Sequence, residues 1–106
     1  MGKIASDLCD KIYLTDDNPR TESPKKIRNN IKAKILKSKL VEIPSRKKAI
    51  EKAIKDLRSD EILIVAGKGH ENYQEYKTKK FFSDKACMID AIHKKNKKLY
   101  KNLKVN

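Results

Sequence analysis

Two short strings in this 106-residue sequence combine the side chains that bind an amino acid. They are residues 16–20 (DDNPR) and residues 67–71 (GKGHE). An arginine can hold a carboxylate through two parallel hydrogen bonds, and a glutamate can accept hydrogen bonds from an ammonium group. An asparagine amide both donates and accepts, and a glycine lets the backbone approach a ligand closely. Together the strings predict a site for a zwitterion, and they suit a nucleic-acid backbone poorly because their acids repel phosphate.

Each string also has an interpretation without a ligand. Asp-Asp-Asn-Pro strings are common in turns, where Asp17 or Asn18 would only cap the loop. The Gly-Lys-Gly run lacks the GxxxxGK[ST] pattern of a phosphate-binding loop, so Lys68 is not a Walker lysine. We expect Lys68 to lie in solvent or to assist loosely in anion binding. We expect His70 to be a structural histidine that ties its loop to a sheet, with a catalytic role as the alternative.

Apolar periodicity predicts alternating helices and strands that would place both strings. We expect helices at residues 2–9 and 24–39, after Ser45 and after Ser83, and strands at residues 11–15, 40–44 and 61–66. The serines before these helices, Ser23 included, are the expected N-caps. Residues 62–66 are consecutively apolar, which is typical of a central parallel strand buried on both faces. Because ligands bind beyond the carboxyl ends of parallel strands, the two strings should lie together at one edge of the sheet.

The same periodicity predicts which side chains form the core. The inward-facing residues expected on the helices are Ile4, Leu8, Ile27, Ile31, Ile35, Ala49, Ile50, Ala53, Ile54, Leu57, Met88, Ile89 and Ile92. Cys9 and Cys87 are expected to act as small buried hydrophobes. Residues 1–93 are expected to form one domain, followed by a basic tail at residues 94–106 that frays or lies in solvent.

The formal charge of +13 favours a solvated helical surface more than a nucleic-acid site. Of the 27 basic residues, 23 are lysine and four are arginine, whereas phosphate and base recognition usually uses more arginine. A small basic module that binds nucleic acid or the ribosome stays open as the alternative. No apolar run reaches the roughly 20 residues of a membrane span, and no secretory signal is visible. We therefore expect a cytoplasmic protein with reduced cysteines and no membrane or metal partner.

The motifs also resemble a known family. Three stretches resemble the C-terminal domain of the Mur ligases, in the branch that adds meso-diaminopimelate. They are TDDNPR followed by SP and a helix, AGKGHENYQ after an apolar stretch, and FSDK before a last helix. The resemblance runs from Met1 to about Ile92. In that branch the Asp-Asn-Pro-Arg string recognises diaminopimelate, with further contacts from the glycine-rich string. The resemblance thus implies a diaminopimelate site formed by Asp17, Asn18, Pro19, Arg20, Gly67 and Glu71.

The resemblance also implies a fold and a reaction. The fold would be α/β, a three-layer Rossmann-like open sheet, mostly parallel, here lacking its first strand because the family has a strand before the stretch that resembles residues 1–5. The reaction of the full-length enzymes uses ATP and Mg²⁺ and needs a central and an N-terminal domain. This sequence has no phosphate loop, carbamylated lysine or magnesium ligands. The chain alone is therefore expected not to catalyse ligation, and a gene fragment without function is a further alternative.

Overall fold

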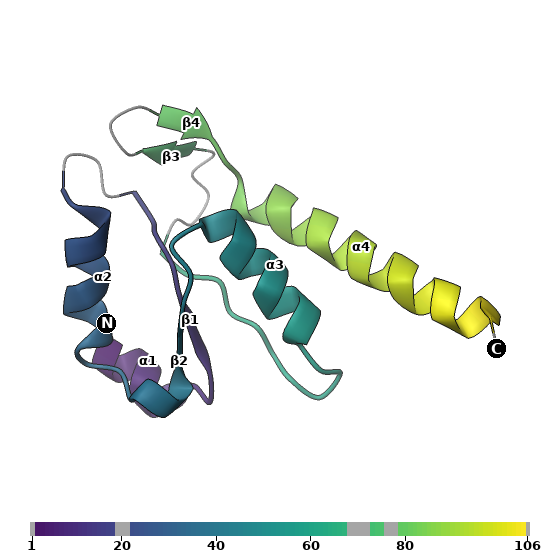
Figure 1. The fold of residues 1–106 in the computed structure, drawn as a ribbon, viewed down its shortest axis with the longest axis horizontal. Helices are drawn as coiled ribbons and strands as arrows, with labels where there is room; N and C mark the ends of the chain where they lie inside the picture. Colours follow the sequence, from purple (N-terminus) through teal and green to yellow (C-terminus); the bar gives the residue numbers. More distant parts are fainter. Residues whose placement is uncertain (1, 19–21, 68–72, 76–78, 106) are drawn as a thin grey trace.

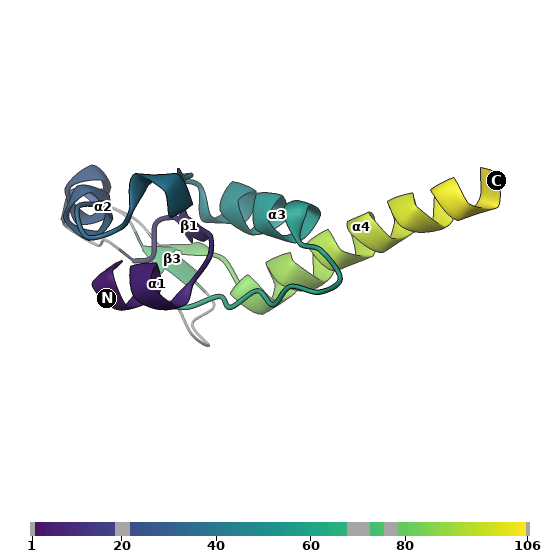
Figure 2. The same ribbon diagram turned by 90° about the horizontal axis from the view of Figure 1, so that it is seen from below.

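The computed structural model describes residues 2–18, 22–67, 73–75 and 79–105. In chain order its elements are α1 (Gly2–Leu8), β1 (Ile12–Leu14), α2 (Pro24–Lys32), the 3-10 turn η1 (Lys37–Lys39), β2 (Leu40–Glu42), α3 (Arg46–Asp56), β3 (Tyr73–Glu75), β4 (Lys79–Phe81) and α4 (Asp84–Val105) (Figure 1). β1 and β2 lie between α1 and α2 on one side and α3 on the other, and α4 projects away from them (Figures 1 and 2). None of the helices in the described part is long and apolar enough to cross a membrane.

The first two strands form a parallel pair, so the fold is α/β. Ile12 lies opposite Leu40 and Leu14 opposite Glu42, and the pairing continues past the strands where the Asp16 amide donates to the Pro44 carbonyl at 3.2 Å. Both strands end within two residues of the predicted positions. β3 and β4 form a separate antiparallel hairpin. The first predicted string, which starts at Asp16, therefore begins just beyond the carboxyl end of β1.

The prediction of a central strand at residues 61–66 is wrong. The segment belongs to neither sheet, and within the described chain no backbone hydrogen bond joins residues 62–66 to another strand. Leu63 and Val65 are half-buried, whereas Ile62 and Ile64 are 89 % and 78 % exposed. A run of five apolar residues indicates burial on both faces only when strands flank it and helices cover both sides. Here the inner side alone is covered, by α3 and α4.

The main core lies between α3 and α4. Ser45 caps α3 by accepting a hydrogen bond from the Lys48 amide at 3.3 Å, as predicted. Four residues of the predicted stripe, Ala49, Ile50, Ala53 and Ile54, are buried, and the fifth, Leu57, follows α3 and is half-buried. Ile50 and Ile54 pack against Ala91 of α4. The half-buried residues that pack around this cluster are Leu63, Phe82, Cys87 and Met88.

The inward face of α4 differs from the predicted one. Ile89 and Ile92, expected in the core, are exposed, while Cys87 and Ala91 face α3. One turn further on, Lys95 donates to the carbonyl oxygens of Ile54 and Leu57 at the end of α3. Because α4 packs on α3 and on the single stretch at 61–66 rather than on a broad sheet, its buried stripe is narrow. Lys95 continues this stripe and caps the end of α3. The helix itself continues to Val105, through the tail that was expected to fray.

The N-terminal helices also differ in detail from the prediction. α2 ends at Lys32 instead of residue 39, although Ser23 caps it as predicted. α1 forms, but its apolar residues Ile4 and Leu8 are exposed, and Gly2 and Ser6 are buried. The reason is close packing, since a Cβ atom on Gly2 would lie 2.6 Å from the Ile31 carbonyl oxygen of α2. α1 therefore packs through its small residues.

Candidate functional site

A single buried guanidinium holds together the ends of three segments at the carboxyl end of β1. Arg46 at the start of α3 donates from Nε and Nη2 to the two carboxylate oxygens of Asp84, at 2.7 and 2.6 Å. Its Nη1 donates to the Asp16 carbonyl at 3.1 Å, and its Nη2 also donates to the Ala66 carbonyl at 3.2 Å. Arg46 is 3 % exposed. Asp16, the first residue of the first string, and Ala66, which precedes the second string, are thus bound to the same side chain, which also binds Asp84 at the start of α4.

The electrostatics keep this guanidinium charged. Burial alone lowers the pKa of Arg46, but hydrogen bonds and charge attraction from Asp84, with a further contribution from the charge of Asp17, raise it above the usual value. A buried charge of this kind is tolerated because its carboxylate partner and two carbonyl oxygens satisfy its donors.

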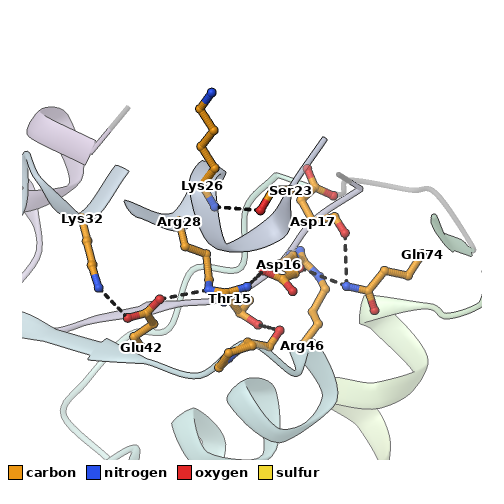
Figure 3. Close-up of polar contacts among 11 residues, drawn as sticks. Thr15, Asp16, Asp17, Ser23, Lys26, Arg28, Lys32, Glu42, Arg46 and Gln74 are labelled. Atoms are coloured by element: carbon orange, nitrogen blue, oxygen red, sulfur yellow. Dashed lines mark hydrogen bonds and ion pairs between the residues drawn. The ribbon is translucent and has the colours of Figure 1, made fainter. Parts of the chain in front are cut away.

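A second arginine anchors the same strand end from the other side (Figure 3). Arg28 of α2 donates from Nη1 to Asp16 Oδ1 at 2.5 Å and from Nε to Glu42 Oε2 at 2.9 Å. Lys32 also donates to Glu42, at 3.1 Å. The hydrogen bond that Arg28 donates to Asp16 raises the pKa of Arg28, and the hydrogen bonds that Arg28 and then Lys32 donate to Glu42 lower the pKa of Glu42. The carboxylate of Asp16 is thus bound within the protein, and Asp17 is the next acid available toward solvent.

The two predicted strings begin side by side. A Cβ atom on Gly67 would lie 3.3 Å from Asp17 Oδ2, and Gly67 has φ +106°, which favours glycine. Gln74 of β3 donates from Nε2 to the carbonyl oxygens of Asp16 and Asp17, at 3.2 and 3.1 Å. The β3–β4 hairpin therefore closes over the start of the first string, as Figure 3 shows for Gln74.

The candidate ligand residues divide into two groups. Asp17, which is exposed, Asn18, which is half-buried, and Gly67 lie at this edge of the molecule. The other three predicted site residues, Pro19, Arg20 and Glu71, lie outside the described residues. Lys68 and His70 also lie outside them.

The residues that hold the site together were missed at the sequence level. These are Arg28, Arg46, Gln74 and Asp84, none of which belongs to either string. Arginine scarcity was the available signal, because a chain with 23 lysines retains only four arginines. Two of those four make ion pairs with carboxylates that are at most 9 % exposed, where the fixed fork of donors cannot be replaced by a lysine.

Replacing Gly67 by alanine should lower the free energy of unfolding by about 1–3 kcal/mol, because a side chain at φ +106° is strained. Urea denaturation followed by circular dichroism measures the change. Gly67→Ala in an Asp17→Ala background separates backbone strain from side-chain contact. The Asp17→Ala change removes the nearby carboxylate, so any loss of stability that Gly67→Ala still causes comes from the backbone conformation. An unchanged unfolding midpoint for Gly67→Ala would show that the turn relaxes freely.

Comparisons with known proteins agree on one family. The family model described as "Mur ligase, glutamate ligase domain" matches residues 1–69. Over 74 residues the chain is 53 % identical to the UDP-N-acetylmuramoyl-L-alanyl-D-glutamate–2,6-diaminopimelate ligase of Rickettsia bellii (strain RML369-C), covering 70 % of this chain. Over 89 residues it is 44 % identical to the ligase of the same name from Chlorobaculum tepidum, covering 83 % of this chain. A solved structure of a ligase with this name superimposes with a TM-score of 0.78 at 36 % identity over 85 % of this chain.

The match covers a small part of each relative. The chain spans 16 % of the Rickettsia bellii protein, 18 % of the Chlorobaculum tepidum protein and 19 % of the chain in the solved structure. The likeness therefore concerns one domain of a much longer enzyme.

Proposed function

The chain belongs to the Mur ligase family, in its C-terminal glutamate ligase domain, and from that premise we propose that it carries the amino-acid site of a ligase that adds meso-diaminopimelate to UDP-N-acetylmuramoyl-L-alanyl-D-glutamate in peptidoglycan synthesis. One observation carries the proposal. The DDNPR string and the glycine-rich string start close together, with Gly67 beside Asp17 and with Arg46 bound to both Asp16 and Ala66, which supports one ligand site between the two strings.

The proposed contacts follow from the chemistry of the ligand. Diaminopimelate carries carboxylate and ammonium groups at both ends, so its site needs donors and acceptors at two places. Arg20 would hold a carboxylate through two hydrogen bonds, and Asn18 would contact the same end of the amino acid. Gly67 and Glu71 would contact the distal end, with Glu71 accepting from the ammonium group. Asp17 and Pro19 complete the proposed recognition string.

Several features of the surrounding fold support this assignment. We propose that residues 1–93 form the amino-acid-binding domain in a three-layer Rossmann-like arrangement, with residues 94–106 as a basic extension. The parallel pair β1–β2, with helices on its flanks, is the part of that arrangement present in the described residues. The two cysteines, Cys9 and Cys87, are unpaired, which is compatible with the cytoplasmic location that we propose.

ATP and Mg²⁺ serve the reaction of the whole family, and we propose no site for either among the described residues of this chain. The Gly-Lys-Gly run at 67–69 is not a phosphate-binding loop. Within residues 2–18, 22–67, 73–75 and 79–105 there is no group of three His, Cys, Asp or Glu side chains that could hold a metal ion. We therefore assign no chemical step to this chain alone. Its proposed role is to bind and orient the amino acid, with the central and N-terminal ligase domains as partners.

Isothermal titration of the 106-residue chain with meso-diaminopimelate tests the proposal directly. We expect saturable binding of meso-diaminopimelate and weaker binding of L-lysine, which lacks the second carboxylate and therefore leaves part of the site unsatisfied. Absence of heat at about 10 mM meso-diaminopimelate, well above a millimolar Kd, would contradict the proposal. Equal binding of both amino acids would contradict the assignment of contacts to the distal carboxylate.

A further inference from the structure

The first residue of the DDNPR string is held by three different parts of the chain. The Asp16 amide donates to the Pro44 carbonyl at 3.2 Å, between β2 and α3. Its carboxylate accepts from Arg28 of α2 at 2.5 Å, and its carbonyl oxygen accepts from Arg46 of α3 at 3.1 Å. Asp16 is 6 % exposed. It is therefore a fixed point from which the rest of the string extends toward the proposed ligand.

The side chain of Gln74 carries this fixed point one residue further. Its Nε2 atom donates to the carbonyl oxygens of Asp16 and Asp17, at 3.2 and 3.1 Å (Figure 3). A terminal amide has two hydrogens on one nitrogen, so it can serve both oxygens at once. Because a peptide group is planar, holding the Asp17 carbonyl also sets the direction of the Asn18 amide. Gln74 thus orients the backbone at Asn18, a residue of the proposed site.

The glycine-rich string is attached to the same carbonyl from both of its ends. Before the string, Arg46 binds the carbonyl oxygens of Ala66 and Asp16. After it, Gln74 binds the Asp16 carbonyl from β3, whose backbone is paired with β4. A carbonyl oxygen has two lone pairs and can accept both donors. Glu71 lies three residues before Gln74, so it is within about 11 Å of chain from this anchor.

We propose that Gln74 is a positioning residue that sets the distance between the two halves of the amino-acid site and thereby selects a diamino diacid of one length. The inference rests on the proposed function, which assigns Asn18 and Arg20 to one end of the ligand and Gly67 and Glu71 to the other. Both halves take their position from the Asp16 carbonyl, one of them through Gln74. A ligand with charged groups at both ends reports the spacing, because a change in spacing leaves one end unsatisfied.

Titration calorimetry with two ligands tests this role. The ligands are meso-diaminopimelate and meso-2,5-diaminoadipate, which has the same end groups and is one methylene shorter. We expect the unmodified chain to bind the longer ligand at least about tenfold more tightly. Gln74→Met keeps the length of the side chain and removes both donors. It should weaken binding of meso-diaminopimelate at least about fivefold and reduce the preference between the ligands to less than about threefold, whereas a merely structural role would weaken both ligands equally.

A matched control separates Gln74 from the stability of its hairpin. Phe81→Ala truncates a side chain of β4 that is 80 % exposed, so it disturbs the hairpin and leaves the two hydrogen bonds of Gln74 in place. This variant should keep both the affinity and the preference of the unmodified chain. Circular dichroism checks that both variants are folded.

Amide hydrogen exchange without ligand measures the positioning directly. Gln74→Met should take up deuterium faster than the unmodified chain in peptides that contain Asp17 and Asn18, and at an unchanged rate in α3. The inference is overturned if Gln74→Met keeps the ratio of the two Kd values, if exchange at Asp17 and Asn18 is unchanged, or if Phe81→Ala causes the same losses. These results leave the proposed function standing, whereas an unmodified chain that binds neither diamino diacid would contradict the proposed function itself and this inference with it.

Discussion

Replacing Arg46 by methionine should lower the free energy of unfolding by about 3–5 kcal/mol, the cost of leaving a buried carboxylate without its cation. Asp84 loses two hydrogen bonds of 2.6–2.7 Å, and the carbonyl oxygens of Asp16 and Ala66 lose their donors. Methionine fills a similar volume, so little of the lost free energy of unfolding comes from a cavity. Most of it comes from the lost charge and hydrogen bonds. For a domain of this size such a loss is a large part of the total stability.

Two controls isolate the ion pair in urea denaturation experiments. Arg58→Met removes an exposed arginine outside the network and should change the free energy of unfolding by less than about 0.5 kcal/mol. Arg46→Met combined with Asp84→Leu removes both charges and should recover much of the loss, since a buried pair replaced by apolar residues is often tolerated. A change below about 1 kcal/mol in the single variant would mean that Arg46 does not hold the three segments together.

The same substitution connects stability with the proposed site. Arg46 binds the carbonyl oxygens of Asp16 and Ala66, the neighbours of Asp17 and Gly67, so it helps to set the spacing between these two proposed site residues. Where Arg46→Met is still folded, binding of meso-diaminopimelate should weaken. Arg46→Lys should recover part of the stability and less of the affinity, because a single ammonium group cannot serve Asp84 and two carbonyl oxygens in the same fixed geometry.

Local signals in the sequence predicted the parts of the fold that depend on nearby residues. Ser23 and Ser45 cap helices where their positions indicate, because capping is decided within one turn of the chain. The apolar stripe of α3 is buried because its period matches a helix that packs along its whole length. The strands β1 and β2 were found because each is short, apolar and followed by turn-forming residues.

The failures concern residues whose environment depends on distant segments. The run at 62–66 has the composition of a central strand, but composition cannot supply the neighbouring strand that pairing requires. Ile89 was assigned to the core from the helical period alone, whereas the face of α4 that packs on the core holds Cys87, Met88 and Ala91. The site shows the same division. The ligand strings were visible as local patterns, while Arg46 and Asp84 are 38 residues apart and meet only in the folded chain.

Replacing Arg20 by alanine should weaken binding of meso-diaminopimelate by about 2–5 kcal/mol, or roughly thirtyfold to several thousandfold in Kd. The reason lies in the proposed role of its guanidinium, which holds a desolvated carboxylate through two hydrogen bonds that no solvent-exposed lysine can replace. Arg20→Lys keeps the charge and loses the paired geometry, so its Kd should lie between those of the unmodified chain and Arg20→Ala.

Arg58→Ala, which removes an exposed arginine outside both strings, should bind as the unmodified chain does. Titration calorimetry of the four proteins under one set of conditions makes the comparison, and equal affinities for Arg20→Ala and Arg58→Ala would remove Arg20 from the site. Unfolding midpoints of the four proteins, measured alongside, separate a lost contact from a lost fold, and we expect them to be the same.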